Sequence, residues 1–309
     1  MLAMISEAWC KSGKCAWRVF LPLLAVLAAG GTSPTQASTF TEEEVVCPVG
    51  GEKFTRMALM SISTWGALPD GMPLGSGRFP VELPQCPSNG LVMYRDFTPE
   101  EVARLAPFIA SEGYKALRSA GETPRYLAYR TAQFLGDKDL HWWLLEASWE
   151  AKNDDPAGER ARRYNTEFVE AARLVKPDAG NLEAIAARFR LANGLRELGS
   201  FDETEAVRAS IVISPKAGGK GTEARENRTA WAGTIADLAG PIARKETSRI
   251  PIDMLGVREA AGFCLRKEIA AKFEEPPPPP LTAFEQEYCA GPKLSETIKE
   301  QRKWLREED

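Results

Sequence analysis

The chain has 309 residues, enough for more than one folded unit, and its 44% hydrophobic and 27% charged residues are typical of a globular protein. A formal net charge of −4 at pH 7 disfavours nucleic acid and anionic membrane surfaces as main partners. The one histidine, His141, excludes metal clusters built on several histidines.

The first 37 residues have the order of a secretory signal peptide. Lys11, Lys14 and Arg18 precede an apolar run over residues 19–29, and a stretch rich in small residues ends at Ala37. A membrane anchor is the alternative, but the run is shorter than the roughly 20 apolar residues that a spanning helix requires. The sequence therefore predicts cleavage after Ala37, a periplasmic or secreted location, and membrane contact only if the leader is retained. Cleavage removes three basic residues and one acid, which takes the formal net charge from −4 to −6.

Residues 38–97 form the first predicted unit, and its two cysteines lie in what resemble halves of a zinc ribbon. Residues 47–51 read Cys-Pro-Val-Gly-Gly, and residues 86–90 read Cys-Pro-Ser-Asn-Gly. A working knuckle has a second cysteine three positions after the first, where Gly50 and Asn89 stand here. The sequence therefore predicts a degenerate zinc-ribbon-like module without a bound metal.

The fate of Cys47 and Cys86 follows from the geometry of such sites. Sulfurs around one zinc ion lie about 3.5–4 Å apart, so the two that remain would be close to disulfide distance. Removing the leader leaves Cys47, Cys86, Cys264 and Cys289, an even number that favours disulfides in an oxidising compartment. We predict a Cys47–Cys86 bridge and a Cys264–Cys289 bridge. The alternatives are free thiols, with Cys264 serving as a small buried hydrophobe.

Within the first unit, residues 66–77 are rich in Gly and Pro, a composition that predicts turns instead of a regular helix or strand. The flanking residues 53–63 and 78–83 could form short strands. The unit is small and rich in loops, so its stability is expected to depend on a cross-link or a metal.

Residues 98–273 have helical periodicity and form the predicted main domain. Thr98-Pro99-Glu100-Glu101 is a strong helix start, and apolar residues then recur at intervals of three and four. Strand-like alternation is nearly absent, so the predicted fold class is mainly α, built of antiparallel helical hairpins. Further helices are predicted over residues 125–135, 139–152, 158–175, 180–198, 201–213 and 256–273.

One hairpin resembles a tetratricopeptide repeat. In residues 191–206, small residues let two helices approach, Leu198-Gly199 ends the first helix, and Phe201 docks between the pair. A weaker hairpin of the same kind spans residues 125–152.

The order of these features resembles a bacterial family known as domain of unknown function 2225. The resemblance rests on the two knuckles, on Met93-Tyr94-Arg95-Asp96-Phe97 after the second knuckle, and on the helical hairpins. Residues 140–149 are similar to that family's aromatic-rich helix, and Leu198-Gly199-Ser200-Phe201 to its later repeat turn. The similarity would cover about residues 45–252, and this chain departs from the family in lacking the complete four-cysteine site. The family implies no established activity.

The C-terminal region is predicted to leave the helical body. Residues 276–280 are five consecutive prolines, a stiff extended spacer, and we assign residues 274–292 to a proline-rich linker. Residues 293–309 form a predicted charged helix.

Catalytic motifs are not recognisable in the sequence. His141 lies among tryptophans, which is typical of core or groove lining, and residues 218–222 lack the lysine–hydroxyl order of a phosphate loop. Helical spacing places Trp142 and Trp149 on one side of their helix and Trp143 on the neighbouring side. All three are candidate anchors for a partner.

The sequence thus favours a scaffold that binds a protein or peptide, with no cofactor. A periplasmic hydrolase that uses acid catalysis and a metal-binding module are the alternatives.

Overall fold

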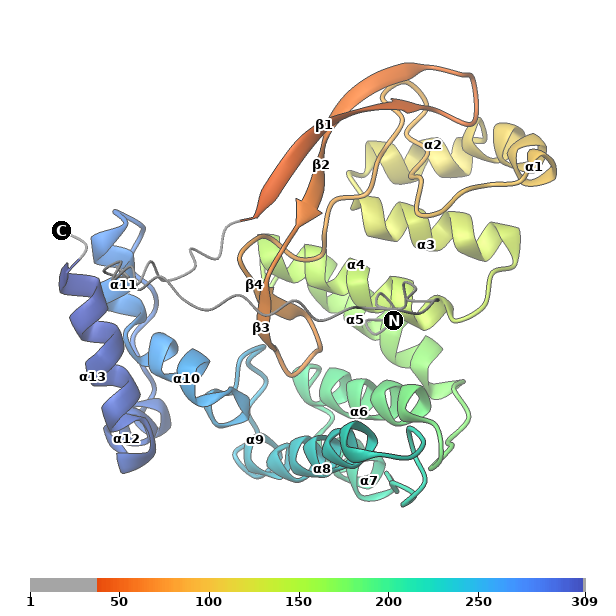
Figure 1. The fold of residues 1–309 in the computed structure, drawn as a ribbon. Helices are drawn as coiled ribbons and strands as arrows, with labels where there is room; N and C mark the ends of the chain where they lie inside the picture. The colour runs from red at the N-terminus through yellow and green to blue at the C-terminus, as the bar shows by residue number, and fades with distance from the viewer. Residues whose placement is uncertain (1–37, 308–309) are drawn as a thin grey trace, which may run out of the picture. The chain divides into compact units, whose positions relative to one another are not determined.

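The computed structural model describes residues 38–307, and within them the fold is mainly helical, as predicted (Figure 1). Two small antiparallel sheets accompany the helices. The predicted leader, residues 1–37, lies outside the described residues. None of the helices between residues 38 and 307 combines the length and the apolar composition that a membrane crossing requires.

The chain begins with a two-stranded ribbon, β1 (Thr39–Val46) and β2 (Lys53–Ser61). Glu43 of β1 pairs with Arg56 of β2, and their side chains form an ion pair with 2.9 Å between Nη2 and the carboxylate oxygen. The strand predicted at residues 53–63 is therefore confirmed, whereas residues 78–83 form no strand.

The prediction that residues 66–77 hold no strand is wrong. A second small sheet joins β3 (Thr64–Ala67) to β4 (Pro73–Gly75) across a tight turn. The amide of Leu68 donates to the carbonyl oxygen of Met72, and Gly71 takes a φ of +91° that L-residues with side chains rarely adopt. Gly and Pro here shape the turn, while the strands on either side need only three or four residues.

The next part of the chain is a run of helices, most of which the sequence predicts. The first has the predicted start: Thr98 caps it, and Thr98 and Glu101 bond to each other's backbone in a capping box. Gly136, with a φ of +83°, ends another helix and turns the chain back. These helices are α1 (Pro99–Ile109), α2 (Glu112–Ser119), α3 (Pro124–Leu135), α4 (Leu140–Asp154), α5 (Glu159–Arg173), α6 (Leu182–Glu197) and α7 (Phe201–Ala209).

From α3 to α7, each helix packs against the next in the chain. The buried faces of α4, α5 and α6 meet in one hydrophobic cluster around Tyr164, Phe168 and Leu191. The turn between α6 and α7 has the predicted form, because Gly199 takes a φ of +84° directly after α6. That these hairpins are tetratricopeptide repeats stays a prediction.

The C-terminal part contains helices that the sequence analysis missed. The segment predicted as one helix over residues 256–273 is two helices, and the range assigned to the linker contains a helix capped by Thr282. The sequence analysis missed α8 (Thr222–Asp237), α9 (Ala239–Ala243), α12 (Ala283–Ala290) and a short 3₁₀ turn, η1 (Ile252–Met254). The segment 256–273 gives α10 (Val257–Cys264) and α11 (Arg266–Lys272), and α13 (Pro292–Glu307) agrees with the helix predicted over residues 293–309.

Cys264 and Cys289 are joined, in the predicted pairing, and their Cα atoms lie 5.7 Å apart. The bridge ties α10 to α12, and α13 packs against α10. The helices after the proline run are thereby fastened to the helices before it.

Candidate functional site

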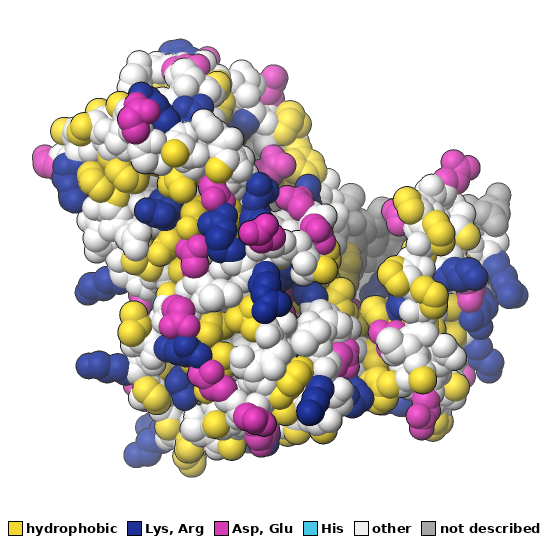
Figure 2. Space-filling view, turned by 180° about the vertical axis from the view of Figure 1, so that it is seen from behind, with side chains coloured by type: hydrophobic (Ala, Val, Ile, Leu, Met, Phe, Trp, Pro, Cys, Tyr) yellow, Lys and Arg dark blue, Asp and Glu magenta, His cyan; other side chains and the backbone are white. Residues whose placement is uncertain are grey.

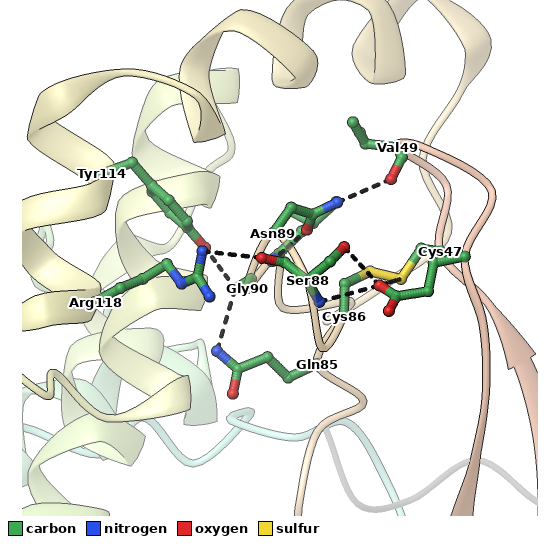
Figure 3. The surroundings of a disulfide bond; sticks show 11 residues. Cys47, Val49, Gln85, Cys86, Ser88, Asn89, Gly90, Tyr114 and Arg118 are labelled. Atoms are coloured by element: carbon green, nitrogen blue, oxygen red, sulfur yellow. Dashed lines mark hydrogen bonds between the residues drawn. A yellow bond between two sulfur atoms is a disulfide. The ribbon is translucent and has the colours of Figure 1, made fainter.

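The two knuckle segments meet around a disulfide bond (Figure 3). Cys47 and Cys86 are each only 1% exposed, and their Cα atoms lie 5.7 Å apart. The carboxylate of Glu52 accepts hydrogen bonds from the amide and the hydroxyl of Ser88. Asn89 donates to the carbonyl oxygen of Val49 at 2.8 Å, so Asn89, at the missing-cysteine position, links the two halves.

The second knuckle also rests on the helices. The hydroxyl of Tyr114, on α2, donates to the carbonyl oxygen of Gly90 at 2.9 Å, and burial raises the pKa of Tyr114 to about 12. Arg118 lies against the same glycine, where an added Cβ would come within 2.2 Å of its Nε (Figure 3). The knuckle pair is therefore built into the core that it shares with α2.

No group of three or more histidine, cysteine, aspartate or glutamate side chains between residues 38 and 307 is placed to hold a metal ion. In the knuckle pair the two sulfurs are bonded to each other and present no thiolate to a metal.

The three candidate tryptophans on α4 are half-buried and face two different clusters. Trp142 and Trp149 pack on the cluster around Tyr164 and Phe168, while Trp143 packs on the cluster of the knuckle module. This confirms the two helix sides that the spacing predicts. Trp143 contacts Tyr94 edge-on, with ring centroids 4.9 Å apart. That any of the three anchors a partner stays a prediction.

Replacement of Trp143 by alanine is expected to lower the free energy of unfolding by about 2–4 kcal/mol, since its ring packs against Tyr94 and the cluster of the knuckle module. Chemical denaturation monitored by circular dichroism measures the change. Leu174→Ala is the control, because that side chain is 83% exposed and its loss is expected to cost less than about 0.5 kcal/mol. A Trp143→Ala protein as stable as the parent would show that the ring is a surface group.

His141 is buried at the start of α4 beside Trp142, with ring centroids 4.6 Å apart. Burial lowers the pKa of His141, and the charges of Asp139 and Glu183, which act in the opposite direction, do not offset it. The imidazole is therefore neutral at pH 7.

Because the lowered pKa disfavours the charged imidazole in the folded state, the unfolded chain binds the proton more readily. Above the ordinary histidine pKa of about 6.5, both states hold a neutral imidazole and the free energy of unfolding is not reduced. We expect the free energy of unfolding to fall as the pH drops from about 6.5 toward the folded pKa, because the unfolded chain then takes up a proton that the folded protein does not. Because the chain has a single histidine, the NMR signals of its ring protons need no further assignment and can be followed against pH in the folded protein. An apparent pKa at or above 6.5 would contradict the expectation. His141→Gln should remove the corresponding part of the pH dependence of stability.

A groove with a volume of about 750 Å³ runs between α3, α4 and α5, and we call it the α3–α5 groove. His141 and Leu144 line it from α4, and the exposed side chain of Leu174 lies at its edge. The other lining residues are Tyr129, Gln133, Asp137, Asp139, Leu140, Thr166, Glu167, Glu170, Ala171, Val175 and Lys176.

The charged lining of the α3–α5 groove is mainly acidic, with four carboxylates and one lysine. Three of the carboxylates pair with arginines, but each of these arginines is shared with a second acid. Arg95 contacts Asp137 and Glu101 at 2.9 and 2.7 Å. In the same way Arg163 is shared by Glu167 and Glu122, and Arg173 by Glu170 and Glu203. The charged groups around the groove therefore keep a net negative charge, even though three of the carboxylates form ion pairs.

A buried ionic network holds the β3–β4 turn against the helices, and sequence reasoning did not find it. Asp70, 2% exposed, contacts Lys152 of α4 at 3.6 Å and Arg249 at 3.1 Å. Lys152 also contacts Glu197 of α6 at 2.6 Å. We call these four residues the Asp70 network. One signal was present: Lys152 falls eight positions after Leu144 and four after Ser148, both of which lie on the buried side of α4.

Burial alone would raise the pKa of Asp70, but the positive charges of Lys152 and Arg249 outweigh it and hold the pKa below its ordinary value. The amide of Met72 also donates to this carboxylate, at 3.0 Å. Asp70 is therefore ionised in the folded protein, and it joins segments from three distant parts of the chain.

Two further carboxylates on α4 have altered acidity. Burial raises the pKa of Glu146 and of Glu150, although Arg125 pairs with Glu146 and donates its backbone amide to Glu150. Neither side chain lines the α3–α5 groove. They hold the guanidinium of Arg125, which also donates to the carbonyl oxygen of Val81.

On the face seen in Figure 2, positive and negative side chains are interspersed, and apolar side chains are exposed singly or in small groups.

No protein-family model, curated protein or solved structure matches this chain.

Proposed function

We propose that this is an exported scaffold that binds a basic, amphipathic peptide or protein segment in the α3–α5 groove. The leader, residues 1–37, would direct the chain to the periplasm, and the two disulfide bonds are compatible with that compartment. Stacked hairpins related to tetratricopeptide repeats, and kinship with domain of unknown function 2225, belong to the same proposal.

The main support for the proposal is that the α3–α5 groove is lined by both apolar and acidic side chains. Leu174 leaves 83% of its surface in solvent beside Leu140 and Leu144. Such an apolar edge gains free energy when a partner covers it. The surrounding carboxylates favour a partner with Lys or Arg on its other face.

The experiment is a selection from a displayed library of random peptides on the folded, oxidised protein. We expect enrichment of peptides with apolar residues at helical spacing and a positive net charge. Leu174→Lys should weaken the selected peptides by more than about tenfold, since it removes the apolar edge and places a positive charge beside a basic peptide. Calorimetry or fluorescence anisotropy measures the affinities.

Val212→Lys is the matched control, because Val212 is an aliphatic side chain, 65% exposed, that does not line the groove. It should leave peptide affinity unchanged. Equal loss in both variants, or enrichment of acidic peptides, would overturn the proposal.

A further inference from the structure

The interior around the Asp70 network holds more positive than negative charge. Two arginines of α6 lie beside it: Arg196 is fully buried, whereas Arg190 is half-buried, and the enclosing protein lowers the pKa of Arg190 to about 10. With these, the described residues place four cations against the carboxylates of Asp70 and Glu197. The nearby acids Glu246 and Asp253 are both bound by Arg244 at 2.8–2.9 Å, so including that group still leaves an excess of one cation. An excess cation in so enclosed a place favours the binding of an anion.

Arg190 is the cation of this set with the fewest partners. Within the described residues, its guanidinium makes one hydrogen bond, from Nη1 to the carbonyl oxygen of Pro69 at 2.7 Å. Phe189 and Trp231 flank it, with ring centroids 5.2 and 5.5 Å from Cζ. A Cβ at Gly71 would lie 2.4 Å from Nε, so the glycine lets the turn approach the guanidinium closely.

Arg190 lines a cavity of about 310 Å³ between the β3–β4 turn, α6 and α8, and we call it the Arg190 pocket. Trp231, Leu68 and Met254 contribute apolar surface, and Asn227 and Thr234 contribute polar atoms. The lining contains no acidic side chain. This volume lies at the lower end of the range for small-molecule sites.

We propose that the Arg190 pocket binds a small carboxylate that carries a flat apolar group. The planar guanidinium has free N–H groups that can take both oxygens of a carboxylate, and the bound charge would offset the excess cation. The ring of Trp231 and the side chains of Leu68 and Met254 would cover the apolar part. This ligand is independent of the peptide proposed for the α3–α5 groove, which is lined by other helices.

The test is a titration of the folded protein with sodium benzoate, followed by the indole N–H signals of the tryptophans in NMR. The Trp231 signal is assigned with Trp231→Phe. We expect that signal to shift and saturate with a Kd on the order of 1 mM, a value suited to so small a ligand. The signal of Trp304, which lines a different cavity, should stay in place. Acetate and inorganic phosphate should bind at least about tenfold more weakly, since neither has an apolar group.

Two variants separate the guanidinium from general folding effects. Arg190→Gln should weaken benzoate binding by at least about tenfold, whereas Arg188→Gln, on the same helix but outside the pocket, should not. Asn227→Asp leaves Arg190 in place and should weaken binding by charge repulsion, with Thr229→Asp as its control. No shift of Trp231 with benzoate, a similar response to phosphate, or unchanged binding in Asn227→Asp and Arg190→Gln would each overturn the proposal.

Discussion

Replacement of Asp70 by asparagine is expected to lower the free energy of unfolding at pH 7 by about 3–5 kcal/mol. The amide oxygen can still accept from the Met72 amide, but an NH₂ group or a neutral oxygen then faces Lys152 and Arg249. Two cations thereby lose their shared buried anion, which is costly because water does not replace it. Urea denaturation followed by tryptophan fluorescence measures the loss.

The pH dependence gives this prediction a distinctive signature. Asp70 has a folded pKa below its ordinary value, so the stability it contributes is complete above the unfolded pKa of about 3.9 and is lost as the pH falls through the folded pKa. The difference between the parent and Asp70→Asn should therefore narrow below about pH 4. Asp237→Asn, at an exposed position on α8, is the control and should change stability by less than about 0.5 kcal/mol. A loss below about 1 kcal/mol for Asp70→Asn would show that the cations find other partners.

Removal of the knuckle disulfide is expected to have an effect of similar size. The double variant Cys47→Ala, Cys86→Ala opens a loop spanning 39 residues, which is worth about 4 kcal/mol in the chain-entropy description. Two buried sulfurs are also lost from the shared core with α2. The knuckle module should unfold first, and exchange of its backbone amides for deuterium, read by mass spectrometry, would locate the change.

The second bridge serves as the comparison. Cys264→Ala, Cys289→Ala opens a shorter loop, with a separation of 25 residues, and its effect should fall on α12 and α13. If removal of the Cys47–Cys86 bridge leaves amide protection in residues 38–97 unchanged, the module is held by Tyr114, Asn89 and the surrounding packing alone.

The local features of this chain are determined by its sequence. The start of α1 follows from Thr98 and Glu101, and the ends of α3 and α6 follow from Gly136 and Gly199, because caps and left-handed turns depend on neighbours in the chain. The pairing of Cys47 with Cys86 agrees with the prediction made from the resemblance of the two segments to halves of a zinc ribbon, in which the remaining sulfurs would lie close together. The mainly helical class followed from the spacing of apolar residues alone.

The candidate sites, in contrast, are decided by tertiary structure. Asp70 lies 179 residues before Arg249 in the chain, and no local pattern pairs an acid in a Pro-Asp-Gly turn with a cation so distant. Trp143 packs on the knuckle module because it contacts Tyr94. The sequence of its own helix could not predict that contact. The acidic α3–α5 groove and the Arg190 pocket likewise exist only where separate helices pack, since the free energy of a buried charge is set by the groups brought around it in the fold.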